Sequence, residues 1–286
     1  MGSVALMDLA RRRFLELPYG VQQWVLRALG RRAPWDPGFD FRAPAVPDGL
    51  QAGPPDFVGI GVQKAGTTWW ASLIDAHPGV YAHPCFHKEL HYFDRFWAEP
   101  FTEDHVPGYH AWFPRPPGKR TGCWTPDYLH QHWVAPLLHA AAPEARLLVL
   151  VRDPVERYVS GVTHDVSRGD RRPAVAAVAF GRGFCTAALE RYERYFGRDR
   201  LLVLQYEACR EAPESALAET FAFLGLEPWS PPSVAEPVNP TRVAKVTLGD
   251  SERRELVARY RDEVLALGER YPSVDLKRWP NFRDVA

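Results

Sequence analysis

The sequence predicts a three-layer α/β fold, in which a parallel sheet lies between layers of helices. Two continuous apolar runs, residues 146–151 and 201–205, have the length and composition of strands buried on both faces of a parallel sheet. A further apolar run, residues 57–62, passes through a glycine-bounded loop into a segment that can begin a helix. Segments with helical periodicity alternate with these runs. Folds of this class bind ligands at the carboxyl edge of the sheet.

The other elements follow the same alternation. Shorter strands are expected near Val80 and near Cys123. A C-terminal helix from residue 251 to about 271 carries apolar residues on one face, and Asp250 or Ser251 can cap it. Further helical patterns cover residues 67–76, 130–141, 155–167, 184–196 and 213–224.

The first 55 residues differ from the rest of the chain. Residues 7–29 have partial helical spacing that Pro18 interrupts, and residues 33–55 are rich in proline and glycine. We expect an N-terminal helical segment and a Pro-rich connector over residues 1–55, and a single domain over residues 56–286. A helix packed on its own domain is favoured over a membrane-surface or partner-binding helix, because Pro18 shortens the amphipathic face.

Composition narrows the class of protein. The chain has 286 residues with 35 basic and 35 acidic side chains, so its charge gives no reason to expect nucleic acid as a partner. No apolar run is long enough for a transmembrane segment, and no secretory leader is evident. Four scattered cysteines favour a reducing compartment, so we expect a cytoplasmic protein. Nothing in the sequence indicates the oligomeric state.

The loop after residues 57–61 is typical of a phosphate cradle. Gly61 and Gly66 have the G-x-x-x-x-G spacing of a P-loop, in which backbone N–H groups and a helix N-terminus point at one anion. However, Thr67 stands where a Walker lysine belongs, and Lys64 lies within the loop instead. The strand, loop and helix together predict a P-loop NTPase-like sheet, and the displaced lysine predicts that the loop binds a nucleotide other than the magnesium complex of ATP.

A second anion-binding segment follows the next long apolar run. Arg152 comes at the strand end, Asp153 is placed to cap a helix, and Pro154 suits its first turn. Ser160 lies two turns further along. An arginine fork and a hydroxyl can hold a second phosphate. The alternative is a surface ion pair of Arg152 with Asp153 or Glu156.

Together, these two segments resemble the nucleotide-binding signatures of the sulfotransferases. Within that family the chain is most similar to the carbohydrate (heparan-type) sulfotransferases and their bacterial relatives. Three further matches occur in the family's order, namely Lys-Glu-Leu-His-Tyr-Phe-Asp at 88–94, Thr-Pro-Asp-Tyr at 125–128, and the paired segments 201–207 and 221–226.

The resemblance implies that 3′-phosphoadenylyl sulfate (PAPS) is the donor and adenosine 3′,5′-bisphosphate (PAP) the product, without a metal. It implies that Lys64 stabilises the bridging oxygen of the leaving phosphate, and that Arg152 and Ser160 bind the 3′-phosphate. An ammonium at that bridge would act mainly in the transition state. The family's basic C-terminal loop has no clean counterpart, and Arg242 and Lys245 are substitutes on position alone. The donor's 5′-phosphosulfate would be held by Lys64, Ala65, Gly66, Thr67, Thr68 and Trp69.

Glu89 is our predicted general base, because it matches the family's acidic residue in the 88–94 segment. Its apolar neighbours, among them Leu90 and Phe93, suggest partial burial that raises the pKa of the carboxyl group. His91 is the second choice as a base. The alternative is a surface glutamate paired with Lys88.

Potential metal ligands cluster near Glu89. His87 and His91 would share one helix face and could bind zinc as a pair. No third ligand stands at a familiar spacing, and the family that the chain resembles uses no zinc, so we expect no metal. The other residues of this type are His83 and Cys85.

The acceptor is less narrowly defined. Trp124 stands where the animal heparan enzymes commonly have a lysine, so a heparan acceptor does not follow from the resemblance. The region 91–133 is dense in aromatic residues, which suit the binding of a sugar ring or of a lipophilic small molecule. Half or more of them are expected in the core. We expect transfer to a hydroxyl, or as second choice an amine, of a carbohydrate-containing or other small-molecule acceptor. The rival hypotheses are a P-loop-type nucleotide-dependent kinase and a non-catalytic nucleotide-binding protein.

Overall fold

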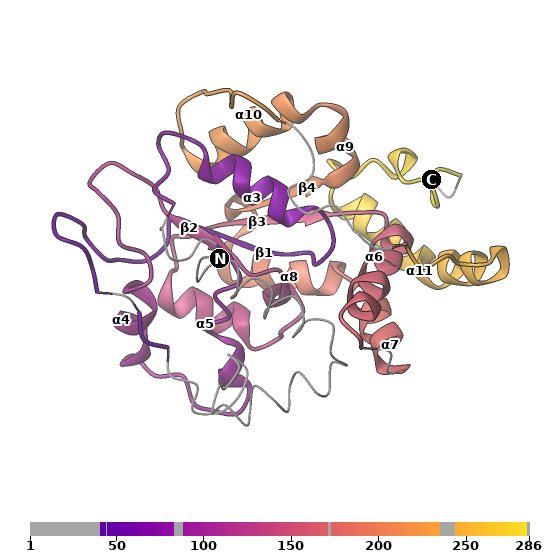
Figure 1. Ribbon diagram of the computed structural model, residues 1–286, viewed down its shortest axis with the longest axis horizontal. Helices are drawn as coiled ribbons and strands as arrows, with labels where there is room; N and C mark the ends of the chain where they lie inside the picture. Colours follow the sequence, from indigo (N-terminus) through magenta and orange to yellow (C-terminus); the bar gives the residue numbers. More distant parts are fainter. Residues whose placement is uncertain (1–40, 44, 83–87, 171–172, 235–243, 285–286) are drawn as a thin grey trace, which may run out of the picture.

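The computed structural model describes residues 41–43, 45–82, 88–170, 173–234 and 244–284 (Figure 1). The predicted N-terminal helix over residues 7–29 lies outside these ranges, as do His83, Cys85, His87 and Arg242. In the part of the chain that the structure describes, none of the helices is both long and apolar enough to cross a membrane.

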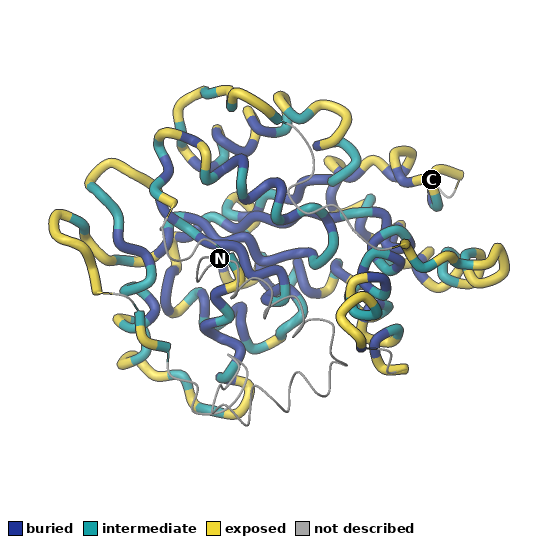
Figure 2. The backbone as a smooth tube through the Cα atoms, viewed as in Figure 1, coloured by how far each residue is buried: buried dark blue, intermediate teal, exposed yellow. Residues whose placement is uncertain are grey.

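Four parallel strands form the sheet, in the spatial order β2-β1-β3-β4. The strands are β1 (Phe57–Gly61), β2 (Gly122–Trp124), β3 (Arg146–Val151) and β4 (Leu201–Gln205). Nearly every residue of β1, β3 and β4 is buried, because helices cover both faces of the sheet (Figure 2). The strands predicted at 146–151, at 201–205 and near Cys123 are therefore confirmed. Near Val80 the structure has only an isolated bridge to Arg120.

Helices complete the three layers. Figure 1 shows α3, α9 and α10 above the sheet and α5 and α8 below it, while α6, α7 and α11 lie beyond the carboxyl ends of the strands. The α-helices are α3 (Thr67–Asp75), α4 (His105–His110), α5 (Val134–Ala141), α6 (Pro154–Ser167), α7 (Pro173–Gly181), α8 (Thr186–Phe196), α9 (Tyr206–Glu211), α10 (Pro213–Leu224) and α11 (Asp250–Arg270). The 3₁₀ turns are η1 (Asp94–Trp97), η2 (Pro126–Leu129), η3 (Arg198–Arg200) and η4 (Leu276–Arg278).

The predicted helices at 67–76, 155–167, 184–196 and 213–224 match α3, α6, α8 and α10 within two residues. The helix predicted from residue 130 begins only at Val134, because residues 130–133, which follow the 3₁₀ turn η2, form an irregular turn. The predicted cap of the last helix was wrong. Gly249 is the N-cap of α11, and its N–H donates to the side chain of Glu252 at 2.8 Å, which is half of a capping box because glycine has no side chain to accept in return.

The aromatic residues between 91 and 133 form mainly a second core beside the sheet. The Phe93 ring lies 4.7 Å from that of Tyr109 and 5.7 Å from that of Tyr128, measured between centroids. Trp97, by contrast, is 60% exposed. The expectation that half or more of these residues are core is confirmed, because the buried ones are Tyr92, Phe93, Phe96, Tyr109, Phe113, Trp124 and Tyr128.

Candidate active site

The loop between β1 and α3 has a backbone that requires glycine. Gly66 is the N-cap of α3 with φ of 84°, and a Cβ there would lie 2.6 Å from ring atoms of Tyr206. Lys64 also has a positive φ, of 68°. The loop is fixed to the sheet, because Val62 N–H donates to Leu150 O at 3.0 Å. A helix N-terminus is thereby left facing the carboxyl edge of the sheet, as an anion site requires.

Arg152 holds the other side of this loop. Its Nη1 donates to the backbone oxygen of Lys64 at 3.0 Å, and its guanidinium lies 4.8 Å from the ring centroid of Tyr206. Its Nε is buried and has no hydrogen-bond partner among the described residues. The alternative of a surface ion pair is not what the structure shows, because Asp153 caps α6 and Glu156 pairs with Arg253 at 2.9 Å.

The start of α6 is anchored by Asp153, as the sequence predicts. Its buried carboxylate accepts two backbone N–H groups of the first helical turn, at 2.9 and 3.2 Å. The other oxygen accepts the N–H and the Nδ2 of Asn281, at 3.0 and 2.9 Å. Burial raises the pKa of Asp153, although these hydrogen bonds oppose the rise. The anchor fixes the direction in which α6 leaves the strand end.

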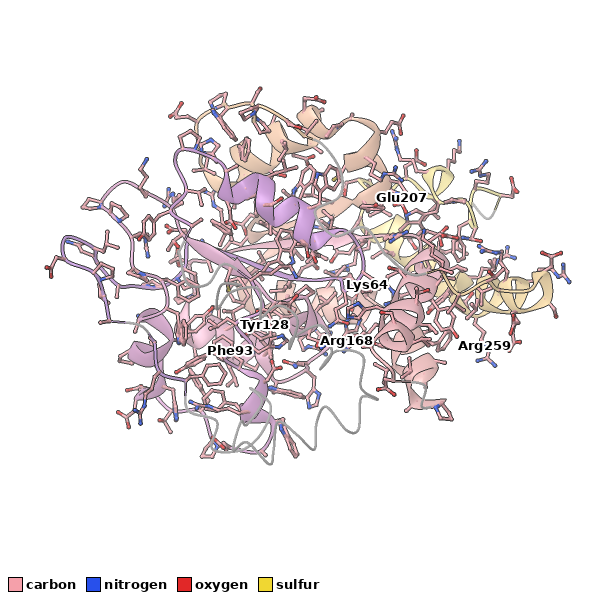
Figure 3. All side chains as sticks on the ribbon, viewed as in Figure 1. Lys64, Phe93, Tyr128, Arg168, Glu207 and Arg259 are labelled. Carbon is pink, nitrogen blue, oxygen red and sulfur yellow. The ribbon has the colours of Figure 1, made fainter. Side chains whose placement is uncertain are left out.

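The side chain of Lys64 lies beside α6. A Cβ on Gly161, the residue after the half-buried Ser160, would be 4.0 Å from the Cγ of Lys64. The predicted loop lysine therefore lies against α6 at the turn of the helix that also carries Ser160. Figure 3 shows Lys64 at the edge of the sheet where α6 begins.

Several charged segments act on Lys64. Burial lowers the pKa of its ammonium group, and the positive charges of Lys88 and Arg152 lower it further. The carboxylates of Asp165 and Glu89 act in the opposite direction. The 88–94 segment and the loop are distant in sequence, yet the structure brings their charged residues within electrostatic range at one edge of the sheet.

Glu89 is the centre of a hydrogen-bonded cluster. Lys88 Nζ donates to Glu89 Oε1, and His91 Nε2 lies 3.1 Å from Glu89 Oε2. His91 Nδ1 lies 2.8 Å from a carboxylate oxygen of the buried Asp94. Glu89 N–H donates to Trp124 O at 2.8 Å, which fixes the segment to the end of β2.

The backbone of this cluster is unusual. Glu89 and His91 have φ values of 60° and 56°, in the left-handed region that non-glycine residues rarely adopt. Such conformations carry a cost and are found preferentially at functional sites. The two positive φ values turn both side chains toward each other.

The pKa values of Glu89 and His91 shift in opposite directions. Burial alone would raise the pKa of Glu89, but hydrogen bonds to His91 and Lys88 outweigh it, and the pKa is lowered. The predicted rise was therefore wrong, because apolar neighbours were weighed without the two cations. Burial would lower the pKa of His91, yet the carboxylates of Asp94 and Glu89 raise it to about 10. At neutral pH Glu89 is ionised and His91 is protonated.

The remaining predicted donor residues lie around the loop. Trp69 is buried and its Nε1 donates to Val234 O at 3.3 Å. Lys245 is exposed, and the next N–H, of Val246, donates to the hydroxyl of Thr163 on α6 at 3.0 Å. Ala65 and Thr67 are buried and Thr68 is half-buried at the start of α3. Their roles in donor binding stay predictions, and Arg242 lies outside the described residues.

The structure adds residues that sequence reasoning missed. Asp94 orients His91, and Tyr206 forms the wall on which both Gly66 and Arg152 pack. The signals were present, because Asp94 follows His91 by three residues and Tyr206 directly follows a strand predicted to end at this edge. In the described ranges, no group of three or more His, Cys, Asp or Glu side chains is arranged to hold a metal ion.

A glycine-bounded loop, a neighbouring arginine and a carboxylate at the carboxyl edge of a parallel sheet define an α/β protein with a P-loop-like site. The family model described as "Sulfotransferase domain" matches residues 54–241 of the chain. The chain therefore belongs to the sulfotransferase family, and the predicted family resemblance is confirmed.

Similar proteins, two curated relatives and one solved structure among them, are also sulfotransferases. The chain is 28% identical over 205 residues to human heparan sulfate glucosamine 3-O-sulfotransferase 6. The aligned segment covers 65% of this chain and 57% of the relative's length. It is 33% identical over 106 residues to the membrane-associated sulfotransferase kil1 of Dictyostelium discoideum, covering 37% of this chain and 22% of that protein. A sulfotransferase structure from Alicyclobacillus acidocaldarius superposes with a TM-score of 0.63 at 22% identity, over 79% of this chain and 98% of that one. The latter shows the shared fold.

Proposed function

We propose that this chain is a sulfotransferase that moves a sulfuryl group from PAPS to a hydroxyl of a carbohydrate-containing acceptor. The observation that carries the proposal is that Glu89, from a separate segment, lies within electrostatic range of Lys64 at the carboxyl edge of the sheet. The heparan sulfate glucosamine 3-O-sulfotransferases among the relatives support the type of acceptor.

The donor fits the residues around the loop. Its 5′-phosphosulfate would bind at the N-terminus of α3, where Gly66 allows a close approach to the backbone. Its 3′-phosphate would bind Arg152 and Ser160. The buried Nε of Arg152, which has no partner in the described part of the chain, supports this assignment, because a buried donor normally has an acceptor.

In the proposed reaction, the acceptor oxygen attacks sulfur as the bond from sulfur to the bridging phosphate oxygen breaks. The proton of the acceptor hydroxyl passes to the carboxylate of Glu89, and Lys64 stabilises the negative charge that develops on the bridging oxygen. PAP and the sulfated acceptor are the products. A sulfuryl group carries less charge than a phosphoryl group, so these steps do not call for a dedicated metal.

Lys88, His91 and Asp94 would position the base. His91 is held in its protonated form by two carboxylates, so it orients Glu89 and is not itself suited to accept a proton. The lowered pKa keeps Glu89 ionised at neutral pH and ready to take the proton. A half-buried lysine and a charged histidine, one on each carboxylate oxygen, restrict the orientation of Glu89.

Calorimetry with PAP and with ATP, each with and without magnesium, tests the donor. The proposal predicts binding of PAP that does not require magnesium and that weakens in Lys64→Ala. Preference for the magnesium complex of ATP would instead support the kinase hypothesis. Turnover tests the base, because Glu89→Gln should bind PAP like the wild type but lose transfer. A Glu89→Gln variant with normal PAP binding and normal transfer would refute the assignment of Glu89.

A further inference from the structure

A pocket of about 750 Å³ opens at the amino edge of the sheet, away from the candidate active site. Its walls come from the residue before β1, from residues 77–79 after α3, from residues 115–120 before β2, and from residues 225–229 after α10. In Figure 1 these segments lie at the end of the sheet opposite α6. The proposed transfer reaction uses none of them.

The floor of the pocket is positively charged. Asp56 accepts from Arg120 Nη1 at 2.9 Å and lies 3.1 Å from the Nε of Arg115. One carboxylate thus faces two guanidinium groups and neutralises only one of their charges. Lys119 adds an ammonium group that donates to a neutral acceptor, the backbone oxygen of Pro78.

A fourth cation lies at the edge of the pocket. A Cβ on Gly225 would be 3.5 Å from Nη1 of Arg146 and 3.7 Å from Nη2 of Arg120, so two guanidinium groups approach the same glycine. Four cations therefore face two carboxylates, those of Asp56 and Glu227, which leaves an excess of two positive charges. The cations are Arg115, Lys119, Arg120 and Arg146.

An aromatic wall completes the pocket. Trp229 is half-buried, and its ring lies 5.3 Å from that of His77 at an interplanar angle of 71°. His77 is itself fixed, because its Nδ1 accepts from Gly79 N–H at 2.8 Å and its Nε2 lies 2.9 Å from Glu227 O. Tryptophan faces stack on sugar rings, while guanidinium groups bind sulfate and carboxylate in a planar fork.

We propose that this pocket binds an acidic oligosaccharide with sulfate or carboxylate groups on more than one sugar. Three of the cations come from residues 115–120, and Arg146 comes from the start of β3. They bond to three different groups, namely Asp56, the backbone oxygen of Pro78 and the backbone oxygen of Phe223, which favours a ligand with several spaced charges over a single phosphate. The proposal concerns binding alone, so it does not depend on the proposed transfer reaction.

Calorimetry with a sulfated heparin-derived tetrasaccharide tests this site on the full chain. The paired substitution Lys119→Gln with Arg120→Gln should weaken binding by about tenfold or more, because it removes two charge-assisted contacts. Lys277→Glu, an exposed lysine on η4, is the matched charge control and should bind like the wild type. Lys64→Ala should also retain pocket binding, and maltotetraose, which is uncharged, should bind at least about tenfold more weakly.

Four results would overturn the proposal. Unchanged affinity in the Lys119 and Arg120 double variant would show that the pocket does not hold the saccharide. Equal losses in Lys277→Glu would show a diffuse charge effect. Loss only in Lys64→Ala would place the saccharide at the candidate active site, and competition by PAP for the Lys119-dependent site would indicate a nucleotide pocket instead.

Discussion

Replacing Gly66 by alanine tests the geometry of the candidate active site most sharply. The backbone at Gly66 has φ of 84°, a conformation that costs an L-residue about 1–2 kcal/mol. The added Cβ would lie 2.6 Å from two ring atoms of Tyr206, well inside the 3.4–4 Å of ordinary contact. The ring must move, and Arg152 stacks on that ring.

The expected cost has two parts. Strain at positive φ contributes about 1 kcal/mol net, because alanine also lowers the entropy of the unfolded chain. Overpacking against Tyr206 adds about 1–3 kcal/mol. We therefore expect Gly66→Ala to lose about 2–4 kcal/mol of unfolding free energy and to bind PAP at least about tenfold more weakly.

Gly49→Ala is the matched control. Gly49 has φ of 80°, and a Cβ there would meet nothing within 4 Å. It carries the same backbone strain without the clash, so we expect a loss of about 1 kcal/mol and normal PAP affinity. Urea denaturation and calorimetry measure both quantities. Equal effects of the two substitutions on stability and on PAP affinity would refute the assignment of Tyr206 as the wall of the donor loop.

Three other predictions concern buried carboxylates and the Glu89 cluster. Asp153→Ala should lower the free energy of unfolding, measured by urea denaturation, by about 2–4 kcal/mol, because four N–H donors lose their acceptor. The control Asp275→Ala, which removes the cap of the exposed η4, should lower it by at most about 1 kcal/mol. Similar losses in the two variants would contradict the anchoring role of Asp153. The folded-state pKa of His91, about 10, exceeds its ordinary value of 6.5, so its stabilising bonds are fully present below about pH 6.5 and are lost as the pH rises through about 10. The unfolding free-energy difference between the wild type and His91→Gln should shrink across that interval, and a constant difference would argue against a protonated His91. Because the pKa of Glu89 is lowered, protonation of Glu89 should not reduce kcat/KM between about pH 8 and pH 6. A fall in kcat/KM in that interval whose midpoint shifts in Glu89→Asp would indicate a raised pKa instead.

The regular fold could be predicted because local sequence and burial agree. Residues 146–151 and 201–205 form strands where continuous apolar runs indicate them, and Pro213–Leu224 forms a helix where its pattern indicates one. The misses have physical causes. The helix Pro173–Gly181 is nearly uniform in hydrophobicity, so it lacks the periodic signal that marks an amphipathic helix.

The candidate site was only partly predictable. Lys64, Arg152 and Glu89 could be chosen because each lies in a short segment with a recognisable spacing. The direction of the pKa shift at Glu89 could not be predicted, because it depends on the hydrogen bonds to Lys88 and His91 and on the left-handed backbone conformation at Glu89 and His91. The pocket around Asp56 also could not be predicted, because four segments distant in sequence form it.

Acceptor-dependent release of PAP from PAPS, measured without added divalent metal, tests the central claim most directly. The account predicts release by the wild type with a saccharide acceptor, and losses of about a hundredfold or more in both Lys64→Ala and Glu89→Gln. Glu89→Gln should retain the wild-type affinity for PAP. Full release by either variant, or transfer that occurs only from the magnesium complex of ATP, would contradict the account.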